Sequence, residues 1–446
     1  MIMIFKKFFK QHSLVRLLWH RLKADLAALS YGFPARKLTV IGITGTDGKT
    51  TTVGMIVHIL NECGIQAGAL STAFFQAKDQ ITFNATQKTS PSPFAIQKFL
   101  AELVKHGCTH AVIECSSHGL IQGRLNHTYP LVAGITNISE EHLDYHGTMD
   151  EYIRAKALLF RMLRKNGTKV LNRDDRSFAY LRTVPTKNSA IYSPAHQLKD
   201  VRGTSASCRA VAHIDGTDHE LALSIPGIFN LNNALCAICC TVGIFDLSLE
   251  QALQALQRYK GVPGRMEKID CGQPFDVYVD FTVTPQAYQA TLTALRSTLP
   301  HGKRLLTLTG SCGDRMREKR PMVGKICSEL SDVVVVTNED PYTEDPQKII
   351  DEVWAGVDQN KTEAHKIFDR RDAIKFIFSK AQPGDAVILC AKGSDTTMWT
   401  AEGQIPWNER EIARELLKQI AQSREQKAND GNTLLTSIMK TARKNS

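Results

Sequence analysis

The sequence predicts an α/β protein: a P-loop-type central domain with helices wound on both faces of a parallel sheet, then a smaller Rossmann-like C-terminal domain. Three observations lead to this fold class. Strand and helix patterns alternate over residues 38–264, a glycine turn directly follows the first strand, and the alternation restarts after a Pro-Gly break at 263–264. Strands that alternate with helices form parallel sheets, because each crossover helix carries the chain back to the same end of the sheet.

The elements follow from apolar periodicity and from turn residues. In the central domain we expect strands at 38–43, 111–115 and 131–135, helices at 50–63 and near 149–163, and a smaller β-rich stretch at 200–225. In the C-terminal domain we expect buried strands at 275–280, 304–309, 333–336 and 386–390. The predicted domain plan is a basic amphipathic helical segment (1–37), the central domain (38–264), the C-terminal domain (265–420) and a polar, disordered tail (421–446).

Composition places the chain among cytoplasmic globular proteins. Of its 446 residues, 43% are hydrophobic and 22% charged, which is ordinary for a globular protein. No apolar run reaches the roughly 18 residues that span a bilayer, and lysines interrupt the N-terminus where a secretory signal would need an apolar core. The eleven cysteines are scattered through apolar stretches, as expected for reduced side chains. We predict a monomer in the cytoplasm.

The net charge of +10 is concentrated at the two ends. Residues 1–37 carry eight Lys and Arg against one acid, a charge of +7, and residues 421–446 contribute +3. The body between them is neutral, which argues against a nucleic-acid partner. The basic N-terminal segment has two interpretations. It rests on an anionic membrane surface as a peripheral contact, or it docks on the body through Val15, Leu18, Leu22 and Leu26. We favour docking.

A phosphate-binding loop is the most informative motif. It follows the first strand and precedes a helix, and it consists of Gly45, Thr46, Asp47, Gly48, Lys49, Thr50 and Thr51. Glycines let backbone N–H groups approach phosphate oxygens, the lysine supplies a cation, and the Thr50 hydroxyl suits Mg²⁺. The match to G-x-x-x-x-G-K-[ST] is imperfect, because Ile43 stands where the first glycine belongs. The motif predicts ATP or GTP binding.

A second group of polar residues follows the next two strands. Glu114 ends one buried strand of the P-loop domain. A carboxylate at this end of the sheet, beside the P-loop, can serve as a Mg²⁺ ligand. The loop after the following strand carries several ionisable side chains, among them His142, Asp144 and His146. Such a cluster next to a P-loop indicates metal or substrate binding.

These motifs and others in the same order resemble the Mur ligases, most closely their UDP-N-acetylmuramoyl-tripeptide synthetase branch. The similarity spans roughly residues 38–415, and the family's P-loop shares the unusual spacing. The matching segments are 45–51, 89–91, 114–118, 137–146 (with Glu141 in place of an aspartate), 152–160, 227–234, 261–267, 313–315 and 319–321.

The resemblance implies roles for individual residues. Lys49, Thr50 and Thr51 would hold ATP phosphates and Mg²⁺, while Glu114 and His142 would bind a second metal ion that carbamylated Lys156 bridges. Asn233 would contact adenine, and Arg265, Asp280 and Lys319 would link the two domains around ATP. The substrate side would comprise Thr89, Ser90, Ser116, Arg124, Asp340, Tyr342, Lys392 and Ser394. Lys49, Glu114, His142 and Lys156 would carry the catalysis.

The implied reaction is ATP-dependent amide formation through an acyl phosphate in peptidoglycan precursor synthesis, joining an amino acid to a UDP-N-acetylmuramoyl-peptide. Full-length members carry an N-terminal domain that binds the uridine nucleotide, whereas only a short basic segment precedes the P-loop here. We therefore expect altered acceptor recognition. Diaminopimelate-adding members have Asp-Asn-Pro-Arg, and residues 339–342 read Glu-Asp-Pro-Tyr instead. Tyrosine cannot capture a carboxylate as arginine does, so L-lysine or another diamino acid is favoured slightly.

Two alternatives stay open at this point. One is a ligase of the same chemistry that extends a different carboxylate acceptor, as polyglutamate-forming ligases do. The other is a non-catalytic nucleotide-binding subunit, against which the joint presence of Lys49, Glu114, His142 and Lys156 argues.

Overall fold

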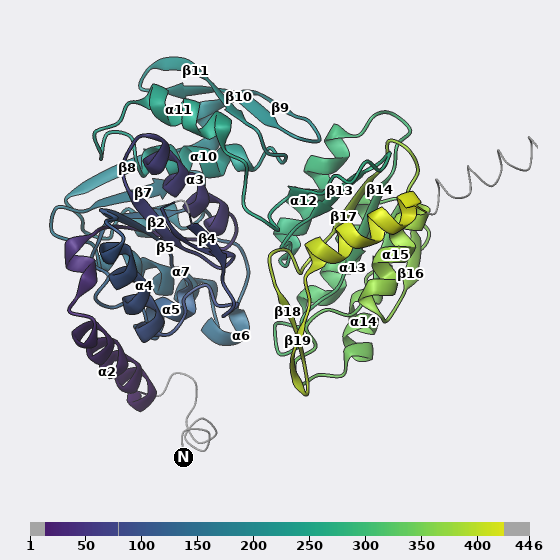
Figure 1. The fold of residues 1–446 in the computed structure, drawn as a ribbon, viewed down its shortest axis with the longest axis horizontal. Coiled ribbons are helices and arrows are strands. Elements are labelled where there is room, and N and C mark those ends of the chain that lie inside the picture. The colour runs from purple at the N-terminus through teal and green to yellow at the C-terminus, as the bar shows by residue number, and fades with distance from the viewer. Residues whose placement is uncertain (1–13, 79, 423–446) are drawn as a thin grey trace, which may run out of the picture.

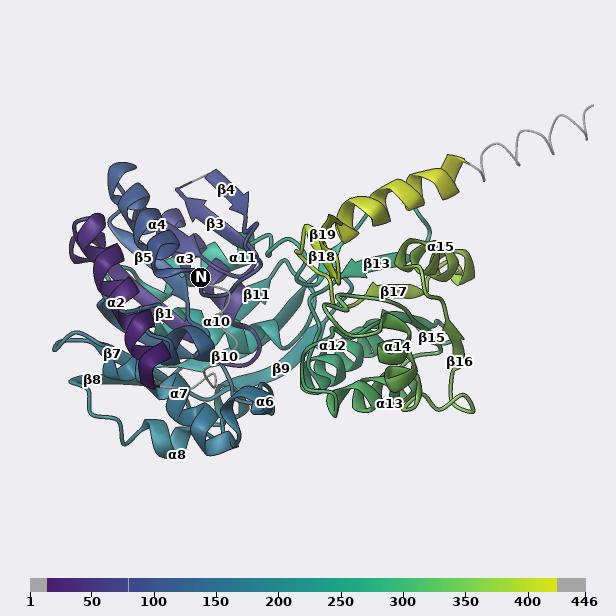
Figure 2. The same ribbon diagram turned by 90° about the horizontal axis from the view of Figure 1, so that it is seen from below.

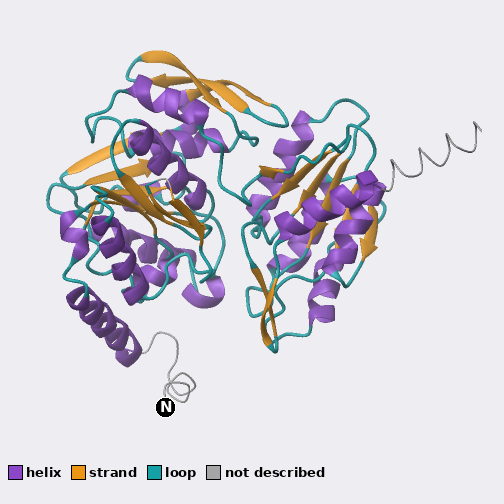
Figure 3. Cartoon of the chain, viewed as in Figure 1, coloured by secondary structure: helices purple, strands orange, loops and turns teal. Residues whose placement is uncertain are grey.

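The computed structural model describes residues 14–78 and 80–422, and it shows two α/β units side by side. The unit with the earlier residues, here the central domain, holds an eight-stranded sheet and a three-stranded sheet (Figure 1). The other unit, the C-terminal domain, holds a six-stranded sheet, and in both the strands lie between layers of helices (Figure 3). The predicted fold class is confirmed.

The large central sheet has the strand order β4-β3-β2-β5-β1-β6-β7-β8. Its strands are β1 (Thr39–Thr44), β2 (Ala67–Leu70), β3 (Phe74–Ala77), β4 (Gln80–Phe83), β5 (His110–Glu114), β6 (Pro130–Ile135), β7 (Thr168–Asn172) and β8 (Asn188–Tyr192). Neighbouring strands pair in parallel along the series β2-β5-β1-β6-β7-β8. Strands β3 and β4 add an antiparallel edge that the sequence analysis did not predict. Strand β4 has only four residues, Gln-Ile-Thr-Phe, and all of them are exposed, so its short apolar alternation marks no buried face.

Helices cover both faces of this sheet, because successive side chains of a strand point to opposite sides. Ile41 and Ile43 face one core and Val40 faces the other. The first core contains α3 (Lys49–Glu62), α10 (Asn230–Cys239), α11 (Leu249–Arg258) and the small sheet of β9 (Leu198–Gly203), β10 (Cys208–Ile214) and β11 (Thr217–Leu223). The second contains α4 (Pro93–Lys105), α5 (Ser117–Ile121) and α7 (Met149–Arg161). Short helices α6 (Leu143–His146), α8 (Phe178–Leu181) and α9 (Pro194–Gln197) lie in the connections.

The C-terminal sheet has the order β12-β13-β17-β14-β15-β16, with β12 antiparallel. Val277 and Val279 face one core and Tyr278 the other. The strands are β12 (Glu267–Lys268), β13 (Asp276–Val279), β14 (Leu305–Thr309), β15 (Val333–Val336), β16 (Glu363–Lys366) and β17 (Ala386–Leu389). One face carries α12 (Pro285–Thr298), α13 (Lys319–Leu330) and α14 (Pro346–Trp354), and the other carries α15 (Arg370–Lys380) and the helix at 409–422. A hairpin of β18 (Thr397–Thr400) and β19 (Gly403–Pro406) projects from this domain.

Helix α2 (Leu14–Ser30) corrects the favoured interpretation of the N-terminal segment. Small side chains, Ala24, Ala27 and Ala28, face the body and are almost fully buried. Leu18, Leu22 and Leu26, which were expected to dock, are 62%, 47% and 46% exposed. Alanines allow the helix to approach α4 closely, which turns the larger side chains outward. The side chain of Val15 lies outside the described residues.

The boundary proposed between residues 264 and 265 lies in the segment that joins α11 to β12. The predicted disordered tail was residues 421–446, and its first two residues lie in the helix at 409–422. Residues 1–13 and 423–446 lie outside the described residues. Among the described helices, none is long and apolar enough to cross a membrane.

Candidate active site

A cavity of about 520 Å³ lies between the two domains, and both contribute to its wall. This volume suits a nucleotide-sized ligand, since small-molecule sites span roughly 300–1,000 Å³. Fifteen of the residues predicted for the site line it: Thr46, Asp47, Gly48, Lys49, Thr50, Thr51, Thr89, Glu114, His142, Asn233, Arg265, Asp280, Lys319, Asp340 and Tyr342. Seven do not: Gly45, Ser90, Ser116, Arg124, Lys156, Lys392 and Ser394.

The P-loop leaves β1 and enters α3 through two glycines with positive φ, Gly45 (145°) and Gly48 (80°). Both positions lie too close to other atoms for a side chain. A Cβ on Gly45 would sit 1.9 Å from Thr136 Oγ1, and one on Gly48 would sit 2.2 Å from Asn233 Oδ1. The loop is also tied to the end of β6, since Thr46 N–H donates to Asn137 O (2.7 Å). These contacts hold the loop that would cradle a phosphate.

Thr50 and Glu114 form the predicted metal-binding corner. The Thr50 hydroxyl donates to Glu114 Oε2 (2.9 Å), and Thr72 donates to the same carboxylate from its backbone N–H (2.7 Å) and its hydroxyl (2.9 Å). Glu114 is buried (1% exposed) at the end of β5, so its orientation is fixed by these three donors. Beside it Lys49 Nζ donates to Thr46 O (2.6 Å) at the start of α3.

Lys156 lies directly behind the P-loop, on α7. Its side chain is 1% exposed, and Nζ donates to Gly45 O (2.5 Å) and lies 4.5 Å from the centre of the Tyr152 ring. Burial, with repulsion from Lys49, lowers the pKa of the Lys156 amine well below its ordinary value. A lowered pKa increases the neutral form of the amine, which is the nucleophilic form.

His142 immediately precedes α6 and has a positive φ of 58°. It belongs to an aromatic cluster in which the His118 and His142 rings are 4.8 Å apart and His118 lies 4.0 Å from Tyr145. Desolvation, helped by His118 and nearby lysines, lowers the pKa of His142 well below its ordinary value. The imidazole is therefore neutral near pH 7, as a metal ligand must be.

Two contacts near the cavity join the domains. Lys319 Nζ, at the start of α13, donates to Glu141 Oε1 (3.2 Å) of the loop before α6. The Thr284 hydroxyl, at the start of α12, donates to Asp47 Oδ2 (3.2 Å) of the P-loop. Glu141 Oε2 is buried with no hydrogen-bond partner among the described residues. The second domain is thus in direct contact with the phosphate-binding side.

Arg265 and Asp280 line the cavity where the C-terminal domain begins. The Arg265 guanidinium lies 4.3 Å from the centre of the Phe281 ring, and its buried Nε has no hydrogen-bond partner among the described residues. Asp280 Oδ1 accepts from Met266 N–H (2.6 Å), and burial raises the pKa of its carboxyl. Arg265 is thus a cation that stacks on the Phe281 ring and whose Nε–H can still donate a hydrogen bond.

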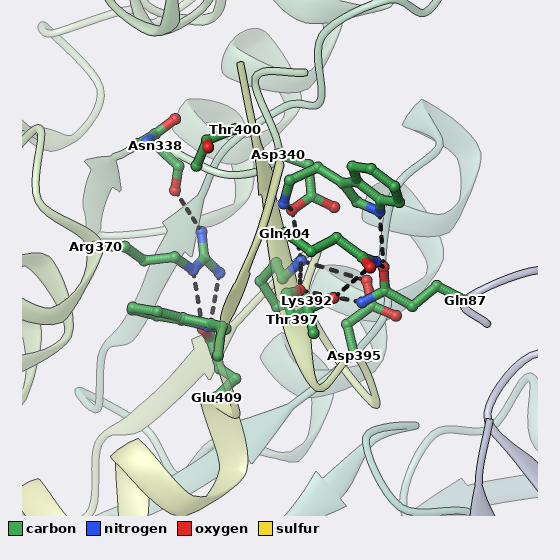
Figure 4. A network of polar contacts seen from close by, with 12 residues as sticks. Gln87, Asn338, Asp340, Arg370, Lys392, Asp395, Thr397, Thr400, Gln404 and Glu409 are labelled. Atoms are coloured by element: carbon green, nitrogen blue, oxygen red, sulfur yellow. Dashed lines mark hydrogen bonds and ion pairs between the residues drawn. The ribbon is translucent and has the colours of Figure 1, made fainter. Parts of the chain in front are cut away.

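The predicted amino-acid pocket has an internal ion pair. Lys392 is fully buried, and its Nζ donates to Asp340 Oδ1 (2.8 Å), Asp395 Oδ2 (3.4 Å) and Thr397 O (2.9 Å) (Figure 4). Burial raises the pKa of Asp395 to about 6 and that of neighbouring Glu339 to about 7. Lys392 therefore supports the pocket from behind. Ser394, also buried, lies in the same turn.

Gln87 was missed by the sequence analysis. It lies in the loop between β4 and α4 of the central domain, and its side chain contacts the β18–β19 hairpin of the C-terminal domain (Figure 4). Its Oε1 accepts from Trp399 Nε1 (2.9 Å) and Gln404 Nε2 (3.3 Å), and its amide donates to Thr397 O (3.1 Å). A glutamine in a polar loop gives no sequence signal, because only the approach of the two domains creates this contact.

Arg315, which lies in a matching segment but was given no role from the sequence, and Trp399, which the sequence analysis missed, both lie against Tyr342. The Tyr342 and Trp399 rings stack with centres 5.6 Å apart, and the Arg315 guanidinium lies 5.1 Å from the centre of the Tyr342 ring. Arg315 and Tyr342 both line the cavity. The position that lacks an arginine in the sequence motif therefore has one beside it in space.

Ser90, Ser116 and Arg124 form a layer behind the wall at Thr89. The Ser116 hydroxyl donates to Ser90 Oγ (3.0 Å), and Arg124 donates to Ser90 O (2.7 Å). The Thr89 hydroxyl oxygen lies 2.8 Å from the Thr72 hydroxyl oxygen. The predicted substrate residues of the central domain are thus gathered in one place, with Thr89 at the cavity.

The residues present fit ATP and Mg²⁺. Arg265 and Glu141 line the same cavity as the P-loop, and each has a buried polar atom (Nε and Oε2) without a hydrogen-bond partner among the described residues. The Thr50–Glu114 corner offers oxygen ligands. Within residues 14–78 and 80–422, no three His, Cys, Asp or Glu side chains converge as a ready metal site.

Comparison with known proteins gives two family matches and several relatives. The model of the Mur ligase middle domain matches residues 43–241, and that of the Mur ligase glutamate ligase domain matches residues 264–393. A UDP-N-acetylmuramyl-tripeptide synthetase of Roseiflexus sp. (strain RS-1) is 36% identical over 421 residues, covering 89% of this chain and 82% of the relative. A UDP-N-acetylmuramoyl-L-alanyl-D-glutamate–2,6-diaminopimelate ligase of Syntrophomonas wolfei is 36% identical over 408 residues, covering 89% of this chain and 81% of the relative.

Solved structures show the same architecture. That of a UDP-N-acetylmuramoyl-L-alanyl-D-glutamate–2,6-diaminopimelate ligase is similar with a TM-score of 0.61 at 27% identity, covering 91% of this chain and 83% of that chain. The Mycobacterium tuberculosis folylpolyglutamate synthase is similar in fold, with a TM-score of 0.69 at 17% identity, covering 84% of this chain and 92% of that chain.

Proposed function

The chain belongs to the Mur ligase family of ATP-dependent peptide ligases in peptidoglycan synthesis, and we propose that it joins an amino acid to the carboxylate of a UDP-N-acetylmuramoyl-peptide. One observation carries the proposal. A single cavity brings together the P-loop, the Thr50–Glu114 corner and two cations of the C-terminal domain, Arg265 and Lys319. The family uses ATP and Mg²⁺, and this arrangement suits transfer of a phosphoryl group to a carboxylate.

The proposed reaction has two steps. An acceptor carboxylate oxygen attacks the γ-phosphorus, the bond to ADP breaks, and an acyl phosphate forms. The amine of the amino acid then attacks the acyl carbon, the bond to the phosphate oxygen breaks, and the amine proton passes to solvent. Lys49, Arg265 and Lys319 would balance the charge on the transferring group, because fixed cations in a dry site stabilise such charge strongly. Asn233, which touches Gly48, would contact the nucleotide base.

Mg²⁺, when bound, would screen the phosphate oxygens. We assign one ion to Thr50 and a second to Glu114, His142 and a carbamate on Lys156. The neutral amine of Lys156 would capture CO₂ and release a proton, which turns a buried amine into a carboxylate-like ligand. The lowered pKa of this amine supports the assignment.

The substrates would lie on opposite sides of the transferring phosphate. Thr89, backed by Ser90, Ser116 and Arg124, would face the muramoyl-peptide. On the other side, Arg315 would hold the α-carboxylate of the incoming amino acid, and Asp340 with Tyr342 would contact its side chain. An acid beside this pocket favours an amine-bearing side chain, so L-lysine or another diamino acid is the proposed substrate. Lys392 and Ser394 would hold the pocket from beneath.

We predict phosphate release that requires both UDP-N-acetylmuramoyl-dipeptide and an amino acid. A panel of amino acids with the purified protein, read as phosphate per minute and as product mass, should give the highest kcat/KM for L-lysine or another diamino acid. The physical reason is that Tyr342 stands where diaminopimelate-adding relatives have a carboxylate-binding arginine, and that the acidic Asp340 replaces the asparagine two residues before it.

Three control outcomes separate the possibilities. Strong preference for meso-diaminopimelate would contradict the assigned pocket but leave the ligase intact. Turnover with a folate or polyglutamate acceptor in place of the muramoyl-peptide would contradict the acceptor. A lack of phosphate release with every acceptor would contradict catalysis altogether.

A further inference from the structure

Helix α2 has two apolar faces of different character. One face carries the alanines that pack on the body, and the other carries large side chains turned to solvent. The outward residues are Leu18 (62% exposed), Trp19 (51%), Leu22 (47%), Leu26 (46%) and Leu29 (67%). Their spacing of three, four and seven residues places them along one side of a helix. A single exposed leucine is ordinary, but a continuous stripe of five large apolar side chains marks an interaction surface.

Cations border this stripe. Lys23 Nζ lies 4.9 Å from the centre of the Trp19 ring, at one margin, and Arg21 is exposed at the other. The acid of the helix, Asp25, is engaged by His127, whose Nε2 lies 2.7 Å from Asp25 Oδ1. Residues 1–37 carry a net charge of +7 while the body is neutral, so the positive charge is local to this end.

The position of α2 leaves the catalytic cavity untouched. In two perpendicular views the helix lies along the edge of the central domain remote from the C-terminal domain (Figures 1 and 2). A surface bound to α2 would therefore lie away from the cavity between the two domains. The helix contributes no residue to the cavity wall.

We propose that the outward face of α2 docks the protein on an anionic lipid bilayer. The apolar stripe would lie at the depth of the acyl boundary, with Trp19 in the interface, and Arg21 and Lys23 would meet the phosphate groups. Charge favours lipid over a second copy of this chain, because a twofold contact through α2 would bring two segments of charge +7 together. An anionic bilayer satisfies both the apolar stripe and its cationic margins.

The test is co-sedimentation of the full chain with vesicles of phosphatidylglycerol and phosphatidylcholine in a ratio of about 1:2, against pure phosphatidylcholine. We expect binding to the anionic vesicles that weakens at high salt, and a blue shift of Trp19 emission, measured as the difference from Trp19→Phe. Leu18→Gln, Leu22→Gln and Leu29→Gln combined should reduce partitioning at least about tenfold, and Arg21→Gln with Lys23→Gln about tenfold. Glutamine keeps a helix propensity close to that of leucine, so α2 should persist in the circular dichroism spectrum.

A matched control removes equally exposed apolar side chains elsewhere. Ile191 (51% exposed), Met322 (48%) and Phe368 (51%), changed together to glutamine, should leave vesicle binding unchanged. The α2 variants should keep ATP-dependent ligation in vesicle-free buffer, which separates this proposal from the proposed reaction. Full vesicle binding by the triple leucine variant would overturn the proposal. So would a dimer in light scattering that this variant dissociates, since a second copy would then cover the face.

Discussion

Lys156→Ala is expected to lower turnover about 1,000-fold or more, and millimolar formate or acetate to restore part of it. The variant removes the side chain that would carry the carbamate and with it the ligands of one metal ion, whose charge stabilises the transferring phosphoryl group. A small carboxylate can enter the space that the side chain leaves and supply the same oxygen ligands. The measurement is phosphate release at saturating ATP, with and without added carboxylate.

Lys169 provides the matched control for this variant. It is also a buried lysine (6% exposed) whose pKa burial lowers, but its Nζ donates to the carbonyls of Leu181, Arg182 and Val184, away from the cavity. Lys169→Ala should lower the melting temperature, leave kcat of the folded enzyme unchanged and show no response to carboxylates. Full turnover by Lys156→Ala would contradict the carbamate assignment, because the side chain would then be dispensable. Loss of turnover without rescue, while Lys156→Arg stays active, would contradict it too and would make Lys156 a cation that holds Gly45.

Glu114→Gln is expected to lower kcat by about 100- to 1,000-fold and to raise the Mg²⁺ concentration needed for half-maximal rate. The amide has the size of the carboxylate, so the side chain stays beside Thr50 and Thr72. What is lost is the negative charge and one oxygen that can bind a cation. The measurement is a Mg²⁺ titration of the initial rate at fixed ATP.

Glu409 is the control carboxylate for this experiment. It is fully buried in an ion pair with Arg370, whose Nε lies 2.9 Å from Glu409 Oε2, and it does not line the cavity. Glu409→Gln should destabilise the C-terminal domain, since a buried charge loses its partner, without changing the Mg²⁺ midpoint. A Glu114→Gln enzyme with normal Mg²⁺ dependence would contradict the metal role of Glu114.

The parts of the site that the sequence could predict are those placed by local rules. Lys49 and Thr50 follow a strand and open a helix, and Glu114 ends a neighbouring strand, so a parallel sheet brings them to the same edge. The structure places Thr50 Oγ1 2.9 Å from Glu114 Oε2, in agreement. The order of strands and helices along the chain was therefore enough to predict the contact between Thr50 and Glu114.

Other features depend on contacts that local patterns do not encode. Gln87 and Trp399 meet because the two domains approach each other, and Arg315 lies beside Tyr342 because two loops of the C-terminal sheet converge. Edge strand β16 is polar and partly exposed, so it lacks the apolar run that marked its neighbours. The periodicity of α2 indicated an apolar face, but it did not say that the alanine side rather than the leucine side faces the body.

The central claim is that the cavity activates a carboxylate by phosphorylation, and transfer of ¹⁸O tests it most directly. The acceptor, labelled with ¹⁸O in its reacting carboxylate, is incubated with ATP, Mg²⁺ and the amino acid, and the released phosphate is analysed by mass spectrometry. An acyl phosphate requires one labelled oxygen to leave in each phosphate while the other stays in the amide. Phosphate that is released with the amide product but carries no ¹⁸O would contradict the account.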